Sequence, residues 1–340
     1  MIRYAGIFLA FAFSHAAEKP VQVVVMDPLS LPLSCSCVDG VGQRRYDKLG
    51  DHLSKVLGRS INLTFEESLD LALRRIRATP DFIIGKDAMV SFDSKRLKLQ
   101  VSPIAALTDR TGAVTHRGVF IVRTKDPAGR LSDLSGRKVM LGPVEEAETH
   151  QAAKTALRKA QLAKSASLEV GGAIDSGALA LTDGEVASAV VPEYLPPLLV
   201  GCEKLSENSV RILAKTPSVY GVRLFRTDVA DNALVKRVLE EVTGLDKQKD
   251  LLIALESAKG FVKIPDQLGW LDWRGPGRRG RRGRPFRIRG TRVHRRAAAP
   301  GSAAAVGPRE RARRRAVSES VPSRSASRAG GREALSLIHI

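Results

Sequence analysis

Apolar and polar positions follow two different periods along most of the chain. Short β-branched runs, such as residues 21–26 and 118–123, are typical of buried strands. Residues 43–57 instead place Leu49 and Leu53 on one face of a helix. Because strand-like and helix-like segments succeed each other in turn, the pattern predicts an α/β protein.

The same pattern predicts further strands at residues 61–65, 81–84, 137–141, 186–191, 210–214 and 219–225. Helices are predicted at residues 66–76, 145–163, 174–182, 228–242 and 247–257. This order gives two α/β units and a short return, so we expect two crossings between the units, at residues 101–108 and 216–222. Two crossings form a hinge, and ligands of such sheets lie beyond the carboxyl ends of the strands.

The predicted organisation is two lobes, each a mixed sheet flanked by helices, with a disordered C-terminal tail. The segments are a signal peptide at 1–16, a first lobe at 17–107, a second lobe at 108–216, a return to the first lobe at 217–264, a linker or start of a truncated propeller-like domain at 265–276, and a tail at 277–340.

The formal net charge of +19 would suggest nucleic-acid binding if the positive charge were spread over the whole chain. Residues 274–340 hold 19 arginines, no lysine and three acidic residues, so the rest of the chain is nearly neutral. The sequence therefore predicts no nucleic-acid partner for the two lobes.

The tail is rich in Arg, Ala, Gly, Ser and Pro and has no helical or strand period. Arginine-rich, lysine-free sequence is typical of a shifted reading frame of GC-rich DNA, and residues 335–340 resemble a translated sequencing adapter. We interpret 277–340 as an artefact of this kind; an RNA-binding arm is the alternative.

The first residues resemble a secretory signal. Arg3 precedes a short apolar run at 7–13, and small residues follow at 14–16. A buried first strand is the alternative. The sequence thus predicts an extracytoplasmic, soluble, monomeric protein without a membrane span after the signal.

Three cysteines are present, Cys35, Cys37 and Cys202. Export permits a disulfide, and pairing of Cys202 with one of the other two is easier than pairing between Cys35 and Cys37. The residues nearby complete neither a metal site nor a haem attachment motif. We expect no cofactor.

Catalytic motifs are missing from the sequence. It contains no Gly-x-Ser-x-Gly elbow, no His-Glu-x-x-His helix and no phosphate-binding loop of the Walker type. A binding protein is therefore a better interpretation than an enzyme.

Three segments carry a resemblance to a known family: 102–105 (SPIA), 118–123 (GVFIVR) and 131–139 (LSDLSGRKV). They resemble the phosphate/phosphonate-type periplasmic substrate-binding proteins, and residues 28–37 and 83–87 look like a subgroup of them. The resemblance covers about residues 21–261. It implies the type II binding-protein fold and reversible capture of a small solute, such as an oxyanion, for ABC-type uptake or sensing.

The chain departs from this family at residues 142–149. Phosphonate transporters present hydroxyls and bare amides after the Gly-Pro loop, a ready anion site. Here the loop carries Glu145, Glu146 and Glu148, which would repel a phosphate. Alternatively, these carboxylates cap a solvated helix.

Five residues are candidates for ligand contact: Ser34, Lys86, Thr149, His150 and Tyr194. They follow predicted strands or begin the helix after the Gly-Pro loop, where ligands lie. Three of them have a structural alternative: Ser34 as a cap, Lys86 as a solvated charge, and Tyr194 as cover for the cleft floor.

Residues 270–276 (WLDWRGP) resemble the start of a quinoprotein-like β-propeller domain. This similarity suggests a second hypothesis, in which the protein is an accessory or partner module of a quinoprotein dehydrogenase system. The partners expected are thus a small ligand and either an ABC permease or a quinoprotein domain.

Overall fold

The structure, a computed structural model, describes residues 18–35 and 42–264. The predicted signal peptide, Cys37, the propeller-like start and the tail lie outside the described residues.

The first sheet is mixed and has the strand order β13-β4-β12-β3-β1-β2. Its strands are β1 (Val21–Met26), β2 (Ile61–Phe65), β3 (Phe82–Lys86), β4 (Val101–Leu107), β12 (Val222–Thr227) and β13 (Phe261–Lys263). β1 pairs in parallel with β2 and β3, whereas β12 pairs antiparallel with β3 and β4.

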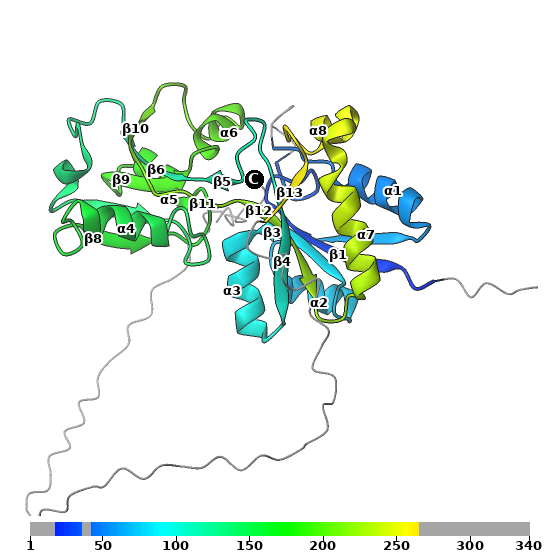
Figure 1. Ribbon diagram of the computed structural model, residues 1–340. Helices are drawn as coiled ribbons and strands as arrows, with labels where there is room; N and C mark the ends of the chain where they lie inside the picture. The colour runs from blue at the N-terminus through cyan, green and yellow to red at the C-terminus, as the bar shows by residue number, and fades with distance from the viewer. Residues whose placement is uncertain (1–17, 36–41, 265–340) are drawn as a thin grey trace, which may run out of the picture. The chain divides into compact units, whose positions relative to one another are not determined.

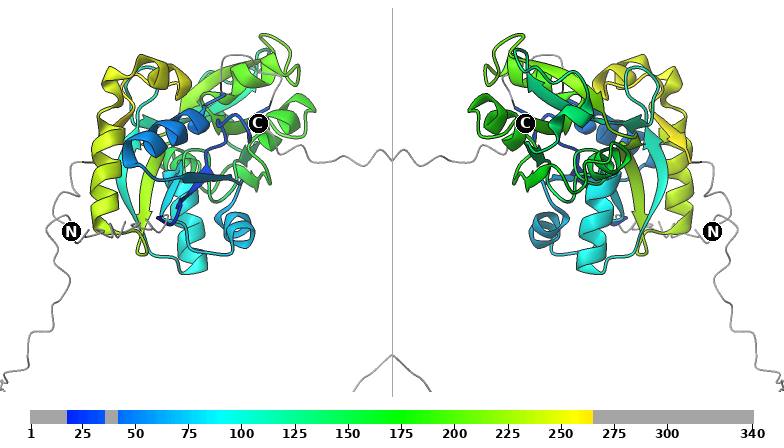
Figure 2. Two further views of the ribbon diagram at one scale, coloured as in Figure 1. Left: turned by 90° about the vertical axis from the view of Figure 1, so that its right-hand side faces the viewer. Right: turned by 90° about the vertical axis from the view of Figure 1, so that its left-hand side faces the viewer.

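Helices cover both faces of this sheet because β1 is apolar on both sides. Val23 and Val25 pack with one set of helices, and Val24 and Met26 pack with the other. The first set is α1 (Tyr46–Leu57), α7 (Asn232–Thr243) and α8 (Lys249–Ala254); the second is α2 (Leu69–Ile76) and α3 (Asp87–Leu97). Figure 1 labels these elements, and Figure 2 shows α7, in yellow-green, beside the strands.

The second sheet has the order β10-β6-β9-β7-β8. Its strands are β6 (Gly118–Arg123), β7 (Lys138–Leu141), β8 (Ser167–Val170), β9 (Ser188–Pro192) and β10 (Val210–Lys215). One face packs on α5 (Ser176–Thr182) and α6 (Leu195–Gly201), and the other packs on α4 (Gln151–Lys159). Short 3-10 turns occur at η1 (Leu131–Leu134) and η2 (Leu245–Lys247).

The chain passes between the sheets twice. It leaves the first sheet after β4 and returns to it at β12, and the two passages pair with each other through β5 (Thr115–His116) and β11 (Val219–Tyr220). The first passage begins one strand later than the sequence indicated, because residues 101–107 pair with β12 and β13.

Several elements differ from the sequence prediction. The strands β5, β8 and β13 were not expected. α3 was not expected because it has no clear apolar face, and it buries Asp93, whose carboxylate accepts a hydrogen bond from the Leu69 N–H. α6 was also not expected. The helix predicted at residues 145–163 is wrong at its start, since residues 145–150 form turns and α4 begins at Gln151.

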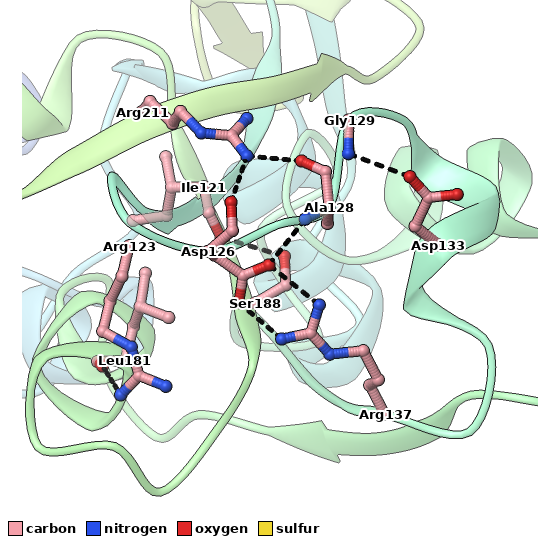
Figure 3. A network of polar contacts seen from close by, with 10 residues as sticks. All are labelled: Ile121, Arg123, Asp126, Ala128, Gly129, Asp133, Arg137, Leu181, Ser188 and Arg211. Atoms are coloured by element: carbon pink, nitrogen blue, oxygen red, sulfur yellow. Dashed lines mark hydrogen bonds and ion pairs between the residues drawn. The ribbon is translucent and has the colours of Figure 1, made fainter.

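An ion-pair network ties together loops and strands of the second sheet (Figure 3). The two terminal guanidinium nitrogens of Arg137 donate to the Asp126 carboxylate, Nη1 at 2.9 Å, and the Ala128 N–H donates to the same carboxylate. Arg211 donates to the carbonyl oxygens of Asp126 and Ala128. The Arg137 hydrogen bond is the main cause that lowers the pKa of Asp126 to about 2.

We predict that Asp126→Asn lowers the free energy of unfolding by about 1–3 kcal/mol at neutral pH, because Arg137 loses its charged partner. Urea unfolding measures the change. The wild-type advantage disappears as the pH falls from about 4 towards 2, where Asp126 becomes protonated in both states. The control is Asp133→Asn, whose bonds lie on an exposed turn; equal effects of the two substitutions would contradict the prediction.

Candidate ligand-binding site

A cavity of about 600 Å³ lies where the two sheets and the two passages meet. This volume is within the range of small-molecule sites. Its lining comes from Asp27, Leu29, Gly42, Arg44, Lys86, Leu107, Asp109, Arg110, Thr111, Ala113, Val114, Thr115, His116, Arg117, Glu193, Tyr194, Leu198, Ser218, Gly221, Val222 and Glu256.

Lys86 is the central charged group of this site. It is the last residue of β3, at the carboxyl end of a parallel strand, where ligands of α/β sheets bind. Its side chain is 3% exposed, and its Nζ forms ion pairs with Glu146 Oε2 and Glu148 Oε1. A residue of the first sheet is thus bound to two carboxylates that follow β7 of the second sheet.

Close packing directs these two carboxylates inward. The loop after β7 lies against Gly118, where an added Cβ would come within 2.4 Å of the Glu148 carbonyl oxygen. At Gly142, an added Cβ would come within 2.0 Å of the Thr149 hydroxyl. Glycine at both positions therefore allows the loop to approach the sheet, so that Glu146 and Glu148 are buried rather than solvated.

His116 and Tyr194 complete the surroundings of Lys86. His116 Nε2 lies 3.5 Å from Glu148 Oε2, and the Tyr194 ring centroid lies 6.0 Å from Lys86 Nζ. The Tyr194 hydroxyl is buried and has no hydrogen-bond partner among the described residues. A buried hydroxyl in this state is a donor that a ligand can use.

Burial and neighbouring charges shift the pKa values of the two carboxylates in opposite directions. Burial raises the pKa of Glu146 to about 8, and the neighbouring Glu148 adds to the rise that Lys86 opposes. Burial acts in the same direction on Glu148, but Lys86 and His116 outweigh it and hold the Glu148 pKa well below its ordinary value. For Lys86, burial is outweighed by Glu146 and Glu148, so its pKa is raised well above normal. Burial therefore leaves Glu146 the weaker acid of the two carboxylates.

A second buried ion pair borders the cavity from the first sheet. Asp27 follows β1, and its carboxylate accepts hydrogen bonds from Arg44 Nη1 at 2.8 Å and the Tyr46 hydroxyl at 2.7 Å. Burial opposes the charge of Asp27, but Arg44 and Tyr46 outweigh it, and the pKa of Asp27 is lowered. Asp27 therefore holds Arg44 in place and neutralises it.

Several other charged residues of the lining are also paired. Arg110 binds Glu256 at 3.0 Å, and Lys215 binds Glu193. Within the described part of the chain Arg117 forms no ion pair, and its Nε donates to the Ser218 hydroxyl at 2.8 Å.

The structure brings together two of the five residues predicted from the sequence, since Lys86 and Tyr194 both line the cavity. Ser34 is not part of the lining; its hydroxyl donates to the Leu31 carbonyl. Thr149 and His150 are buried and are not part of the lining. Thr149 packs on Gly142, and His150 bonds through Nδ1 to the Gly142 carbonyl at 3.0 Å and through Nε2 to Lys154 at 2.8 Å.

Sequence reasoning missed Asp27, Arg44, His116 and Arg117, and it gave Glu146 and Glu148 only a repelling or capping role. The position of Asp27 directly after a predicted buried strand was the available signal. His116 and Arg117 lie at the passage between the sheets, and nothing in the local pattern distinguishes them.

The cysteines and the metal-binding residue types add no further site. Cys35 and Cys202 are both disulfide-bonded. In residues 18–35 and 42–264, no cluster of His, Cys, Asp and Glu could hold a metal ion. No helix in these two ranges has both the length and the apolar composition needed to cross a bilayer.

Comparison with known families assigns the architecture. The family described as "ABC transporter, phosphonate, periplasmic substrate-binding protein" matches residues 39–268, most of the chain. The chain belongs to this family. It is therefore a solute-binding protein of the extracytoplasmic type and not an enzyme. The resemblance to this family seen in the sequence is confirmed, whereas the similarity of residues 270–276 to a propeller start stays a prediction.

Several solved structures share the fold at low sequence identity. The protein PhnD1 from Prochlorococcus marinus in complex with methylphosphonate has a TM-score of 0.55 and 14% identity, covering 72% of this chain and 93% of that one. The protein XAC2383 from Xanthomonas citri bound to ATP has a TM-score of 0.54 and 15% identity, covering 72% and 90%. A binding component of an ABC phosphonate transporter from Pseudomonas aeruginosa has a TM-score of 0.54 and 13% identity, covering 73% and 82%. No curated protein sequence matches the chain.

The raised pKa of Glu146 predicts a pH dependence of stability. Between the ordinary value of 4.5 and about 8, the folded state keeps a proton that the unfolded state releases. Rising pH in this window therefore favours unfolding. We expect Glu146→Gln to lose this pH-dependent destabilisation. The free energy of unfolding of the variant, minus that of wild type, should therefore increase from pH 5 to pH 8.

Urea unfolding across this pH range tests the prediction. Glu145→Gln is the matched control, because Glu145 lies in the same loop and forms no ion pair with the described residues. Parallel pH profiles for wild type and Glu146→Gln would contradict the prediction.

Proposed function

We propose that this protein captures one small solute in the cavity between its two sheets and presents it to an ABC-type permease or a sensor, after export through an N-terminal signal. The observation that carries the proposal is the cavity itself, of about 600 Å³ and lined from both sheets and both passages. A ligand in this position would contact both sheets and thus favour their approach.

The ligand would be held by the donors that the protein leaves available. The Tyr194 hydroxyl is buried without a partner among the described residues, and Arg117 lies at the cavity without an ion pair. A small oxyanion, the class suggested by the family, could accept hydrogen bonds from both groups. The apolar lining residues Leu29, Leu107 and Leu198 would contact a carbon-bearing part of the ligand.

The proposal is tested by thermal unfolding of the full chain with a panel of sulfonates, phosphonates, carboxylates, amines and nucleotides, followed by calorimetry. A true ligand at a hundred times its dissociation constant should stabilise the protein by about 2.7 kcal/mol. If no compound class shifts the unfolding temperature, the proposed capture of a solute in this cavity is wrong.

Tyr194→Phe tests where that ligand binds. We expect ligand affinity to fall roughly 5- to 10-fold, because one hydrogen bond is lost. The ligand-free protein should keep its stability, because the hydroxyl has no partner to lose within the described residues. The control Tyr220→Phe removes the hydroxyl of a tyrosine that stacks on Arg223 outside the lining. Unchanged affinity in Tyr194→Phe would place the ligand elsewhere.

A further inference from the structure

Two buried carboxylates, which are not themselves lining residues, share the ammonium of Lys86, which lines the cavity. Glu146 and Glu148 are 4% and 0% exposed, and both form ion pairs with Lys86. The buried cation best placed to bind an oxyanion is therefore already occupied by groups of the protein itself.

Several backbone amides of the same loop are also used within the protein. The Glu146 N–H donates to the Pro143 carbonyl, and the Thr149 and His150 N–H groups both donate to the Glu146 carbonyl. The Ala152 N–H, in the first turn of α4, donates to the Ala147 carbonyl. Four amides that could have formed an anion site are used within the loop and the helix start.

We infer that Glu146 and Glu148 are specificity-determining residues: they occupy Lys86 and exclude doubly charged oxyanions, so that the ligand carries at most one negative charge. This inference rests on the proposed solute-binding function and narrows its ligand class. A phosphonate or phosphate dianion is excluded, whereas a sulfonate, a carboxylate or a neutral solute is admitted.

Competition for Lys86 explains why dianions are excluded and why ligands with one or no negative charge are admitted. A dianion that approaches Lys86 must displace at least one carboxylate held at high effective concentration by the chain. The remaining carboxylate then faces the ligand at close range in a desolvated site, where like charges repel strongly. A singly charged or neutral ligand avoids this cost, since it can bind Tyr194 and Arg117 while the ion pairs of Lys86 stay intact.

The test uses two anions of the same shape, methylphosphonate as a dianion at pH 8.5 and methanesulfonate as a monoanion. Calorimetry gives the ratio of their affinities for wild type and for the double variant Glu146→Gln/Glu148→Gln, in the full chain. We expect the ratio to rise by roughly tenfold or more in favour of methylphosphonate in the double variant, because Lys86 is then free and the repulsion is gone.

Two further variants make the result decisive. Glu145→Gln changes the net charge of the same loop without touching Lys86, and it should leave the ratio unchanged. Glu148→Gln keeps one carboxylate for Lys86, so it should raise the ratio in favour of methylphosphonate by a smaller factor than the double variant does. This single variant still tests the inference if the double variant does not fold.

The inference is overturned if wild type binds methylphosphonate as tightly as the carboxamide variants do, or if the ratio is the same in all of them. It is also overturned if the variants bind neither anion, because removal of the carboxylates then exposes no anion site. The wider ligand panel judges the proposed function separately, so a failure here leaves that result intact.

Discussion

An ammonium group buried from water requires negative charge beside it, and the site of this protein is organised around that requirement. Lys86 meets it with two carboxylates rather than one. Because Lys86 belongs to the first sheet and both glutamates follow a strand of the second, the same interaction joins the two sheets at the ligand site. Its charge balance also sets which solutes can approach.

The surrounding structure places these charges with little freedom. Gly118 and Gly142 allow the loop after β7 to lie close to its own sheet, and Thr149 and His150 hold it there. On the other side, Asp27 fixes and neutralises Arg44. The electrostatics of this cavity therefore come from these individual side chains and their partners rather than from the sheets alone.

Much of the fold was predictable because it depends on local periodicity. The β-branched runs gave the strands, and the amphipathic segments gave most of the helices. α3 was missed because it lacks a clear local period. It buries Asp93, whose carboxylate accepts a hydrogen bond from the Leu69 N–H, and no local pattern reveals this contact. The helix predicted from residue 145 begins only at Gln151, because residues 145–150 form turns against the sheet.

The sequence by itself determined the α/β class, the passage of the chain between two units and the position of Lys86 at the end of a strand. These follow from the side-chain period and from strand order, which are local properties. Only the tertiary structure decided the role of the acidic loop. In sequence, Glu146 and Glu148 could equally face water at a helix start. Their burial against Lys86, 60 residues away from Glu146 along the chain, depends on long-range packing that places opposite charges in contact.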